Sequence, residues 1–215
     1  MEYIVKKTKK RKKTIGVSII NNKIIIYAPI DTKKEIFDKI YNKYKDKLQM
    51  NNININKNYI LYLGKKYEIK KIKSNLLKMS YCEILDNDFI IYIPEKQFND
   101  ENSIELAINN WKKQEAQKIF SERIKFYLNK YNFNFDFNKN KIFYKNQKSK
   151  WGSCSYINNL NFNYNAISKN IEVIDYLIVH ELTHTLIKNH SKNFWLFIEN
   201  ILPNYKTLRQ QLKNN

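Results

Sequence analysis

Runs of β-branched and aromatic residues, separated by turn residues, characterise the first 97 residues of the chain. Five segments have the composition and the length of strands. They are residues 14–19, 23–28, 58–63, 66–72 and 89–93. Asn21-Asn22 is expected to form a hairpin turn between the first two segments, and Gly64 marks the turn between the third and the fourth. We therefore expect a β-rich N-terminal region over residues 1–97.

One helix is expected to interrupt this β-rich region. Asp31 or Thr32 can cap it, and it would run to about Leu48. Apolar residues recur at helical spacing along it and predict its buried face. They are Ile36, Ile40 and Tyr44.

The strongest helical signal lies in the second half of the chain. Apolar residues at near-helical spacing predict a long helix over residues 103–131, with Ser103 as its N-cap. A polar, strand-like segment follows at 141–165. Alternation within 159–164 places apolar residues on one face of a strand and asparagines on the other. The apolar positions are Leu160, Phe162 and Tyr164. This strand could lie at the edge of a sheet or inside it.

Three more helices are expected near the C-terminus. Asn170 is a suitable N-cap for the first, with Glu172 in its first turn. Ser191 can cap the second, which Pro203 stops, and a short basic helix follows at 205–212. No Gly-, Pro- or Ser-rich linker divides the chain, so residues 1–97 and 98–215 can share one compact unit.

The formal net charge is +19, because 39 lysines and arginines face 20 acidic residues. A charge of this size attracts polyanions such as nucleic acids. The chain is also rich in lysine, asparagine and isoleucine throughout, so a solvated lysine surface explains the excess equally well. The basic run from Lys6 to Lys13 has the same two interpretations, a nucleic-acid contact or a solvated terminus.

Other compositional features point to a cytoplasmic protein without membrane spans. No apolar run approaches membrane-spanning length, and the first residues lack the apolar core of a secretory signal. The two cysteines, Cys82 and Cys154, are far apart in sequence and have no close partner at metal-ligand spacing. We interpret both as small, mostly buried hydrophobic residues in a reducing compartment.

The candidate chemistry is concentrated in one short stretch, because all three histidines of the chain lie between residues 180 and 190. His180 and His184 are four residues apart, which places them on one face of a helix. Glu181 completes the H-E-x-x-H arrangement of zinc hydrolases, in which the glutamate handles the proton of a metal-bound water. His190 can reach the same ion if the helix ends first. Asn189 is suited to ending it, because Asn tolerates the left-handed conformation.

Several stretches together closely resemble the YgjP-like metallopeptidase family, which is related to the SprT-like zincins. The strongest are residues 146–154, 173–176, 180–184, 189–192 and 194–195; 12–15 and 62–65 resemble the front half of the family. The resemblance covers nearly the whole chain. It implies an α+β fold in which the β-rich N-terminal region precedes a zincin-like catalytic region at 98–215. This catalytic region would contain an active-site helix and a small β-sheet. Thr183, Thr185 and Asn170-Ile171 depart from the family pattern without affecting the chemistry.

The resemblance also implies specific roles for the four motif residues. His180, His184 and His190 would hold one Zn²⁺ per chain, and Glu181 would be the catalytic base. The expected function is that of a zinc-dependent peptidase acting on proteins or peptides. Two alternatives remain: a metal-dependent hydrolase of nucleotide phosphoanhydrides, and a nucleic-acid-associated protease or binding module. The sequence does not indicate an oligomeric state.

Four further residues or segments could contribute to the site, and each could instead have a purely structural role. Glu199 could orient a histidine, although a solvated helix face is favoured. The segment 151–154 could shape the cleft or pack in the core, and Tyr205 could donate a hydrogen bond to the site. The strand at 159–164 would bind extended peptides if it lay at a sheet edge.

Overall fold

The computed structural model describes residues 3–7, 15–20, 23–43 and 58–214. The fold is α+β, as expected, with helices and small mixed sheets. The chain divides into two compact units, Met1–Asn58 and Tyr59–Asn215. The expected division into a β-rich region (1–97) and a catalytic region (98–215) follows the change from strand-rich to helix-rich sequence. That these two regions have separate roles stays a prediction.

The first unit contains a three-stranded sheet. Its strands are β1 (Tyr3–Lys7), β2 (Gly16–Ile20) and β3 (Lys23–Ala28), in the order β1-β3-β2. The central strand β3 pairs parallel with β1 and antiparallel with β2. The strands predicted at 14–19 and 23–28 are confirmed, whereas β1 was not predicted because lysines fill its end. Asn21-Asn22 lie outside the described residues.

The helix of the first unit turns a different face inward from the one predicted. Residues 34–43 are helical, so the helix begins after both expected caps. Ile36 is 41% exposed, whereas Phe37 is 4% exposed and packs with Ile24 and Ile26 of β3. Ile40 does contact this core, as expected. The predicted face was wrong at Ile36, because one residue turns the helix surface by about 100°. Residues 44–48 lie outside the described residues.

The second unit begins with a four-stranded sheet. Its strands are β4 (Tyr59–Tyr62), β5 (Lys65–Ser74), β6 (Tyr81–Leu85) and β7 (Asp88–Pro94), in the order β4-β5-β7-β6. The central pair β5–β7 is parallel, and the outer pairs are antiparallel. The three segments predicted here are confirmed. The strand β6 was missed, because it is short and its apolar run is interrupted by Glu83.

The β4–β5 turn is held against the start of α3 (Ile171–Thr183), the site helix that carries the first residues of the predicted motif. Leu63 and Gly64 both have positive φ, 49° and 77°, as a two-residue type I′ hairpin turn requires. The Leu63 backbone N–H donates to the Ile167 carbonyl at 2.7 Å. A Cβ on Gly64 would lie 3.1 Å from the Asn170 Cβ. The hairpin and the residues before the site helix therefore fix each other.

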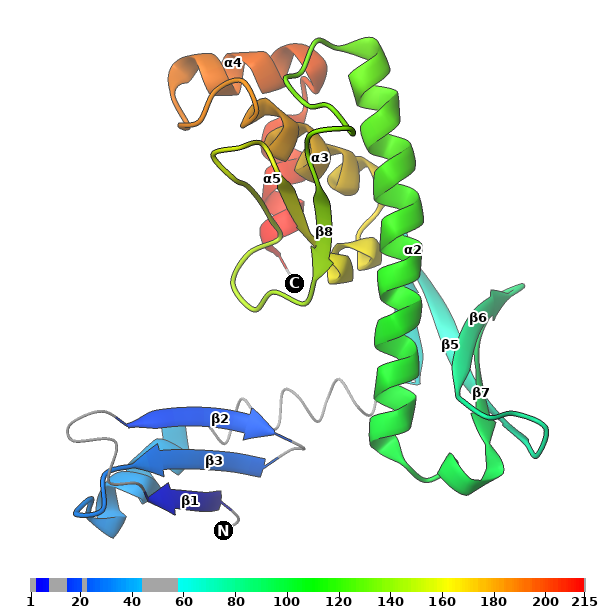
Figure 1. Ribbon diagram of the computed structural model, residues 1–215, viewed down its shortest axis with the longest axis vertical. Coiled ribbons are helices and arrows are strands. Elements are labelled where there is room, and N and C mark those ends of the chain that lie inside the picture. Colours follow the sequence, from blue (N-terminus) through cyan, green and yellow to red (C-terminus); the bar gives the residue numbers. More distant parts are fainter. Residues whose placement is uncertain (1–2, 8–14, 21–22, 44–57, 215) are drawn as a thin grey trace. The chain divides into compact units, whose positions relative to one another are not determined.

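The long helix α2 (Glu101–Lys130) is the backbone of the second unit. Strands β5–β7 lie along its first half, and β8 and the helix α3 lie along its second half (Figure 1). Its buried positions include Trp111, Phe120 and Ile124. The predicted N-cap was wrong: Asp100 caps the helix by accepting from the Asn102 N–H. Ser103 instead donates its hydroxyl to the Asp100 carboxylate at 2.6 Å.

The third sheet lies next to the site. Its strands are β8 (Ile142–Lys145), β9 (Gly152–Cys154) and β10 (Leu160–Asn163), in the order β8-β10-β9. Leu160 and Phe162 are fully buried, as the alternation predicts. An edge position for 159–164 was wrong, because β10 pairs with β8 on one side and β9 on the other. The edge facing the site is β9.

Short helices complete the second unit. They are η1 (Glu95–Gln97), η2 (Tyr164–Ser168), α3 (Ile171–Thr183), α4 (Lys192–Ile201) and α5 (Tyr205–Lys213). Asn170 and Ser191 occupy the N-cap positions of α3 and α4, as predicted, although neither side chain bonds to its helix. No helix among the described residues is long and apolar enough to cross a membrane.

Candidate metal centre

The helix α3 carries His180 and ends immediately before His184, which is its C-cap residue. Ten of its thirteen residues are buried, because it packs against α2, α4, α5 and β9. The helix ends at Thr183, six residues before Asn189, and Asn189 is not among the positive-φ residues. The expected ending at Asn189 was therefore wrong. A turn closed by Thr185 and Leu186 N–H groups takes its place.

The early end of α3 allows the chain to bring His190 back to the first two histidines. The Nε2 atom of His190 lies 3.2 Å from that of His180 and 3.1 Å from that of His184. One ligand atom from each histidine falls within 4.8 Å of the others. A tetrahedral ion with metal–nitrogen bonds near 2.0–2.1 Å would separate its nitrogens by about 3.3 Å. The three imidazoles therefore fit a single metal ion.

Neighbouring groups set the orientation of the imidazoles. The Nδ1 atom of His184 lies 3.1 Å from the Ile187 carbonyl, a contact in which Nδ1–H donates and leaves Nε2 free to ligate. The buried Phe194 ring contacts all three imidazoles, at centroid distances of 4.5–5.1 Å. Trp195 stacks on His190 at 5.4 Å and 18°. Phe194 and Trp195, both on α4, therefore pack against the imidazoles and form one wall of the site.

All three histidines are favoured in the neutral form that a metal requires. Burial, together with the charges of His184, His190 and Arg209, lowers the pKa of His180 to about 3. Burial also lowers the pKa values of His184 and His190. The His180 Nδ1 atom is buried without a hydrogen-bond partner among the described residues.

Glu181 is a buried carboxylate beside the histidines. It is 4% exposed, and its Oε2 atom has no hydrogen-bond partner among the described residues. Burial raises its pKa to about 8, against an opposing effect of Lys150. A buried carboxyl oxygen without a partner is costly. This orphaned oxygen is what a base needs in order to accept a proton from a bound water or a substrate group.

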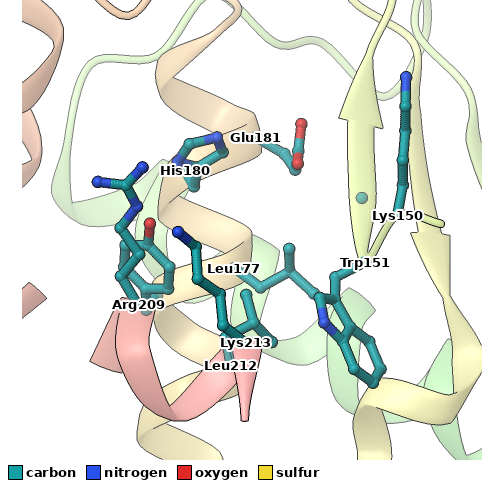
Figure 2. A pocket seen from close by; sticks show the side chains of 10 residues that line it. Lys150, Trp151, Leu177, His180, Glu181, Arg209, Leu212 and Lys213 are labelled. Carbon is teal, nitrogen blue, oxygen red and sulfur yellow. The ribbon is translucent and has the colours of Figure 1, made fainter. Parts of the chain in front are cut away.

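A cavity of about 240 Å³ opens beside His180 and Glu181. Strand residues line one side and the helix α5 lines the other, with α3 between them (Figure 2). The lining residues are Lys150, Trp151, Gly152, Tyr176, Leu177, His180, Glu181, Arg209, Leu212 and Lys213. The candidate site therefore has an open approach next to its buried carboxylate.

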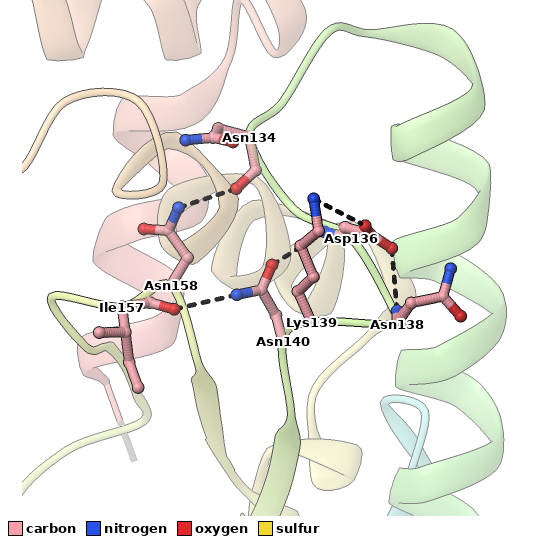
Figure 3. Close-up of polar contacts among 7 residues, drawn as sticks. All are labelled: Asn134, Asp136, Asn138, Lys139, Asn140, Ile157 and Asn158. Carbon is pink, nitrogen blue, oxygen red and sulfur yellow. Dashed lines mark hydrogen bonds and ion pairs between the residues drawn. The ribbon is translucent and has the colours of Figure 1, made fainter.

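A polar network holds the loop after β9. Asn158, at φ 61°, donates its amide to the Asn134 carbonyl, and Asn140 donates to the Ile157 carbonyl, both at 2.9 Å (Figure 3). Lys188, two residues before His190, donates to the Ser155 carbonyl at 3.0 Å and to the Asn158 side chain. The loop that carries His190 is thereby tied to the loop that follows the edge strand.

The secondary candidates have separate outcomes. Trp151 lines the cavity and also packs against the core, so both interpretations of it hold. Tyr205 is buried and stacks on Trp195 at 5.7 Å; it does not line the cavity. Glu199 is half-buried, and the contact that orients His184 comes from the Ile187 carbonyl. The two cysteines are free and half-buried.

Sequence reasoning missed the cations of the cavity. Arg209 and Lys213 lie on the helix that was interpreted only as a short basic one. Their spacing of four residues places them on one helix face, which was the available signal. Lys150 precedes a strand too short to predict. Gly152 belongs to the segment 151–154 that was expected to shape the cleft or pack in the core, and it lines the cavity; its proximity to Glu181 has no sequence signal.

Residues 13–215 match the YgjP-like family, metallopeptidase domain. No curated protein matches the chain.

Proposed function

This chain belongs to the YgjP-like metallopeptidase family, and on that premise we propose that it is a zinc-dependent peptidase with one zinc ion per chain. His180, His184 and His190 would be the ligands, and Glu181 the catalytic base. Membership alone supports a metal-dependent peptidase and a protein or peptide substrate. The observation that carries the finer proposal is the convergence of three imidazole nitrogens beside a buried, unpartnered carboxyl oxygen.

The ligand set supports zinc over the other common divalent cations. Three imidazoles without a carboxylate ligand suit zinc, whereas magnesium and calcium prefer oxygen ligands. Three protein ligands also leave the open position that catalytic zinc sites keep. When bound there, zinc lowers the pKa of a coordinated water toward about 7 and polarises the scissile carbonyl.

Glu181 can serve as the proton carrier of the reaction. It follows His180 on α3, and its carboxylate lies in the cavity between the helix and the strand side (Figure 2). Burial raises its pKa to about 8, whereas the charge of a zinc ion held by the histidines would favour the carboxylate, which is the form that accepts a proton. It would take the proton of the attacking water and pass it to the leaving amine nitrogen.

The edge strand β9 can position an extended peptide. It pairs on one side with β10 and, among the described residues, has no strand on its other side. A peptide can add to such an edge through main-chain hydrogen bonds, which require little side-chain selectivity. Since Gly152 of β9 contacts Glu181, a peptide bound along this edge would pass close to the base.

The nucleotide hydrolase and the nucleic-acid-associated protease stay predictions. Residues 8–13 of the basic run lie outside the described residues, so its two interpretations remain open. The cytoplasmic location also stays a prediction.

The test is cleavage of a denatured protein by the zinc-loaded wild type beside Glu181→Gln at matched zinc content. We expect cleavage by the wild type and loss of at least about a hundredfold in the variant, since general base catalysis contributes roughly 10²–10⁴-fold. Full activity in a zinc-loaded Glu181→Gln protein would contradict the proposed role. Turnover of nucleotides, without peptide cleavage, would favour the phosphoanhydride hydrolase.

A further inference from the structure

Three cations surround the cavity that contains the proposed catalytic residues. Lys150 comes from the strand side, and Arg209 and Lys213 come from α5 on the other side, with His180 and Glu181 between them (Figure 2). All three cations are exposed. None of them forms an ion pair with a carboxylate in the part of the chain that the structure describes. Their charge is therefore available to a ligand.

Arg209 is held in position by an aromatic ring. Its guanidinium carbon lies 4.6 Å from the centre of the Trp195 ring. Trp195 in turn stacks on His190. A stacked guanidinium keeps its N–H groups in a fixed plane, which matches a carboxylate in a two-point contact. The metal centre and the Arg209 side chain are thus connected through one aromatic ring.

Most of the remaining cavity lining is apolar. Leu177 of α3, Leu212 of α5 and the Trp151 ring supply carbon surface between the cations. This surface suits the aliphatic part of an amino acid whose charged end reaches Arg209. It does not suit a basic residue, because three cations would repel it. The cavity volume of about 240 Å³ is of the size of an amino-acid side chain or a chain end.

We propose that this cavity binds a carboxylate of the peptide substrate, with Arg209 as its main partner and Lys150 and Lys213 as supporting charges. The carboxylate is either that of an acidic side chain or the C-terminal one. The proposal rests on the proposed peptidase function, and it identifies Arg209 as a residue that determines specificity next to the scissile bond.

Binding to a protein that cannot turn over its ligand tests this directly. The protein is full-length, zinc-loaded Glu181→Gln, and the readout is Kd by titration calorimetry at low salt. The first peptide is acetyl-Ala-Ala-Glu-Ala-Ala-amide. The second carries Gln instead of Glu, and the third carries Gln and a free C-terminal carboxylate. We expect one of the two carboxylate peptides to bind about tenfold more tightly than the neutral peptide. Which one binds tightly identifies the source of the carboxylate.

Variants on α5 locate the effect. In the same background, Arg209→Gln is expected to abolish the tenfold preference, and Lys206→Gln to keep it. Lys206 is the matched control, because it is an exposed cation on the same helix. It contacts the Tyr205 ring and does not line the cavity. If Arg209→Gln fails to fold, the double variant Lys150→Gln, Lys213→Gln is used, and a reduced preference is expected. Equal affinity for all three peptides would overturn the proposal, as would a preference that survives Arg209→Gln.

Cleavage of the same peptides by the wild type separates the two proposals. Cleavage without a carboxylate preference would leave the peptidase standing and remove the carboxylate subsite. An Arg209-dependent preference in binding, without peptide cleavage, would support the carboxylate subsite and count against the peptidase.

Discussion

A Cβ atom built on Gly152 would lie 2.7 Å from Oε1 of Glu181 and 2.9 Å from its Cγ. A Cβ atom does not approach another heavy atom this closely, so any larger residue at position 152 requires the Glu181 side chain to shift. The relationship joins β9 to α3 at the residue that is proposed to carry the proton. It makes Gly152 a positioning residue for Glu181.

Gly152→Ala should therefore displace the Glu181 carboxylate and lower kcat/KM by about a hundredfold, since misplacement of a catalytic group by about 1 Å can cost that much. The zinc content should not change, because the substitution does not touch a histidine. Peptide cleavage and metal analysis of the same preparation measure both. Ser153→Ala is the control on the same strand, and an unchanged kcat/KM in Gly152→Ala would refute the positioning role.

Zinc should stabilise the folded chain through the three histidines. A ligand present at a hundred times its Kd adds about 2.7 kcal/mol to the free energy of unfolding if it binds only the folded state. We expect zinc to raise Tm in the wild type and to have little effect on His190→Ala. His190 is the most suitable position, because it is the exposed member of the triad and its removal leaves no core cavity. Asn189→Ala is the control; a full zinc-dependent rise in His190→Ala would show that His190 is not a ligand.

The ion pair between Arg123 and Asp175 should contribute measurably to stability. Arg123 of α2 donates to both carboxylate oxygens of Asp175 on α3, at 2.7 and 2.6 Å. The two side chains retain 24% and 11% exposure, so solvent screens part of their attraction. Breaking this pair should therefore cost less than breaking a fully buried one. Asp175→Asn should lower the free energy of unfolding by about 2 kcal/mol, as urea titration would measure.

The comparison for that experiment is a looser pair on the surface. Lys139 and Asp136 lie 3.8 Å apart with 82% and 44% exposure. Lys139→Ala should therefore change stability by less than about 0.5 kcal/mol. Equal effects of the two substitutions would mean that the α2–α3 ion pair is not a specific source of stability.

The two cysteines should react slowly with alkylating reagents in the folded protein. Burial raises the pKa of Cys82 to about 12 and that of Cys154 to about 11. Because the thiolate is the reactive form and its fraction falls tenfold for each unit of pH below the pKa, both thiols are almost fully protonated at pH 8. The rate of iodoacetamide labelling should rise from pH 8 to pH 10. Urea-unfolded protein is the control, and equal rates in the folded and unfolded chain at pH 8 would contradict the prediction.

Local spacing was sufficient to locate much of this fold. The helix predicted at 103–131 appears as α2, because its apolar residues recur with the helical period and the tertiary structure uses that face. Its N-cap was misplaced, since the polar residues Glu101 and Asn102 hide the start of the helix from a hydrophobic pattern. The strand β6 was missed for a related reason: a short strand on the outside of a sheet has too few apolar positions to detect.

The edge strand illustrates a different limit. Alternation in residues 159–164 correctly predicted the strand β10, and Leu160 and Phe162 are buried as expected. Whether a strand lies inside a sheet depends on its partners, which here come from 142–145 and 152–154. Gly152, Ser153 and Cys154 have no hydrophobic pattern, so pairing with β10 alone makes them a strand.

The sequence by itself determined the chemistry that one helix can display: His180, Glu181 and His184 follow from a spacing of one helical turn, and the gathering of all histidines in one stretch indicated a metal. The tertiary structure decided how α3 ends at Thr183, which lets His190 return to the other two, and it decided which residues surround them. Gly152 reaches the site from β9, Lys150 from the segment before β9, and Arg209 from α5. The physical reason is that helical periodicity acts over a few residues, whereas strand pairing and helix packing join segments whose separation along the chain carries no local signal.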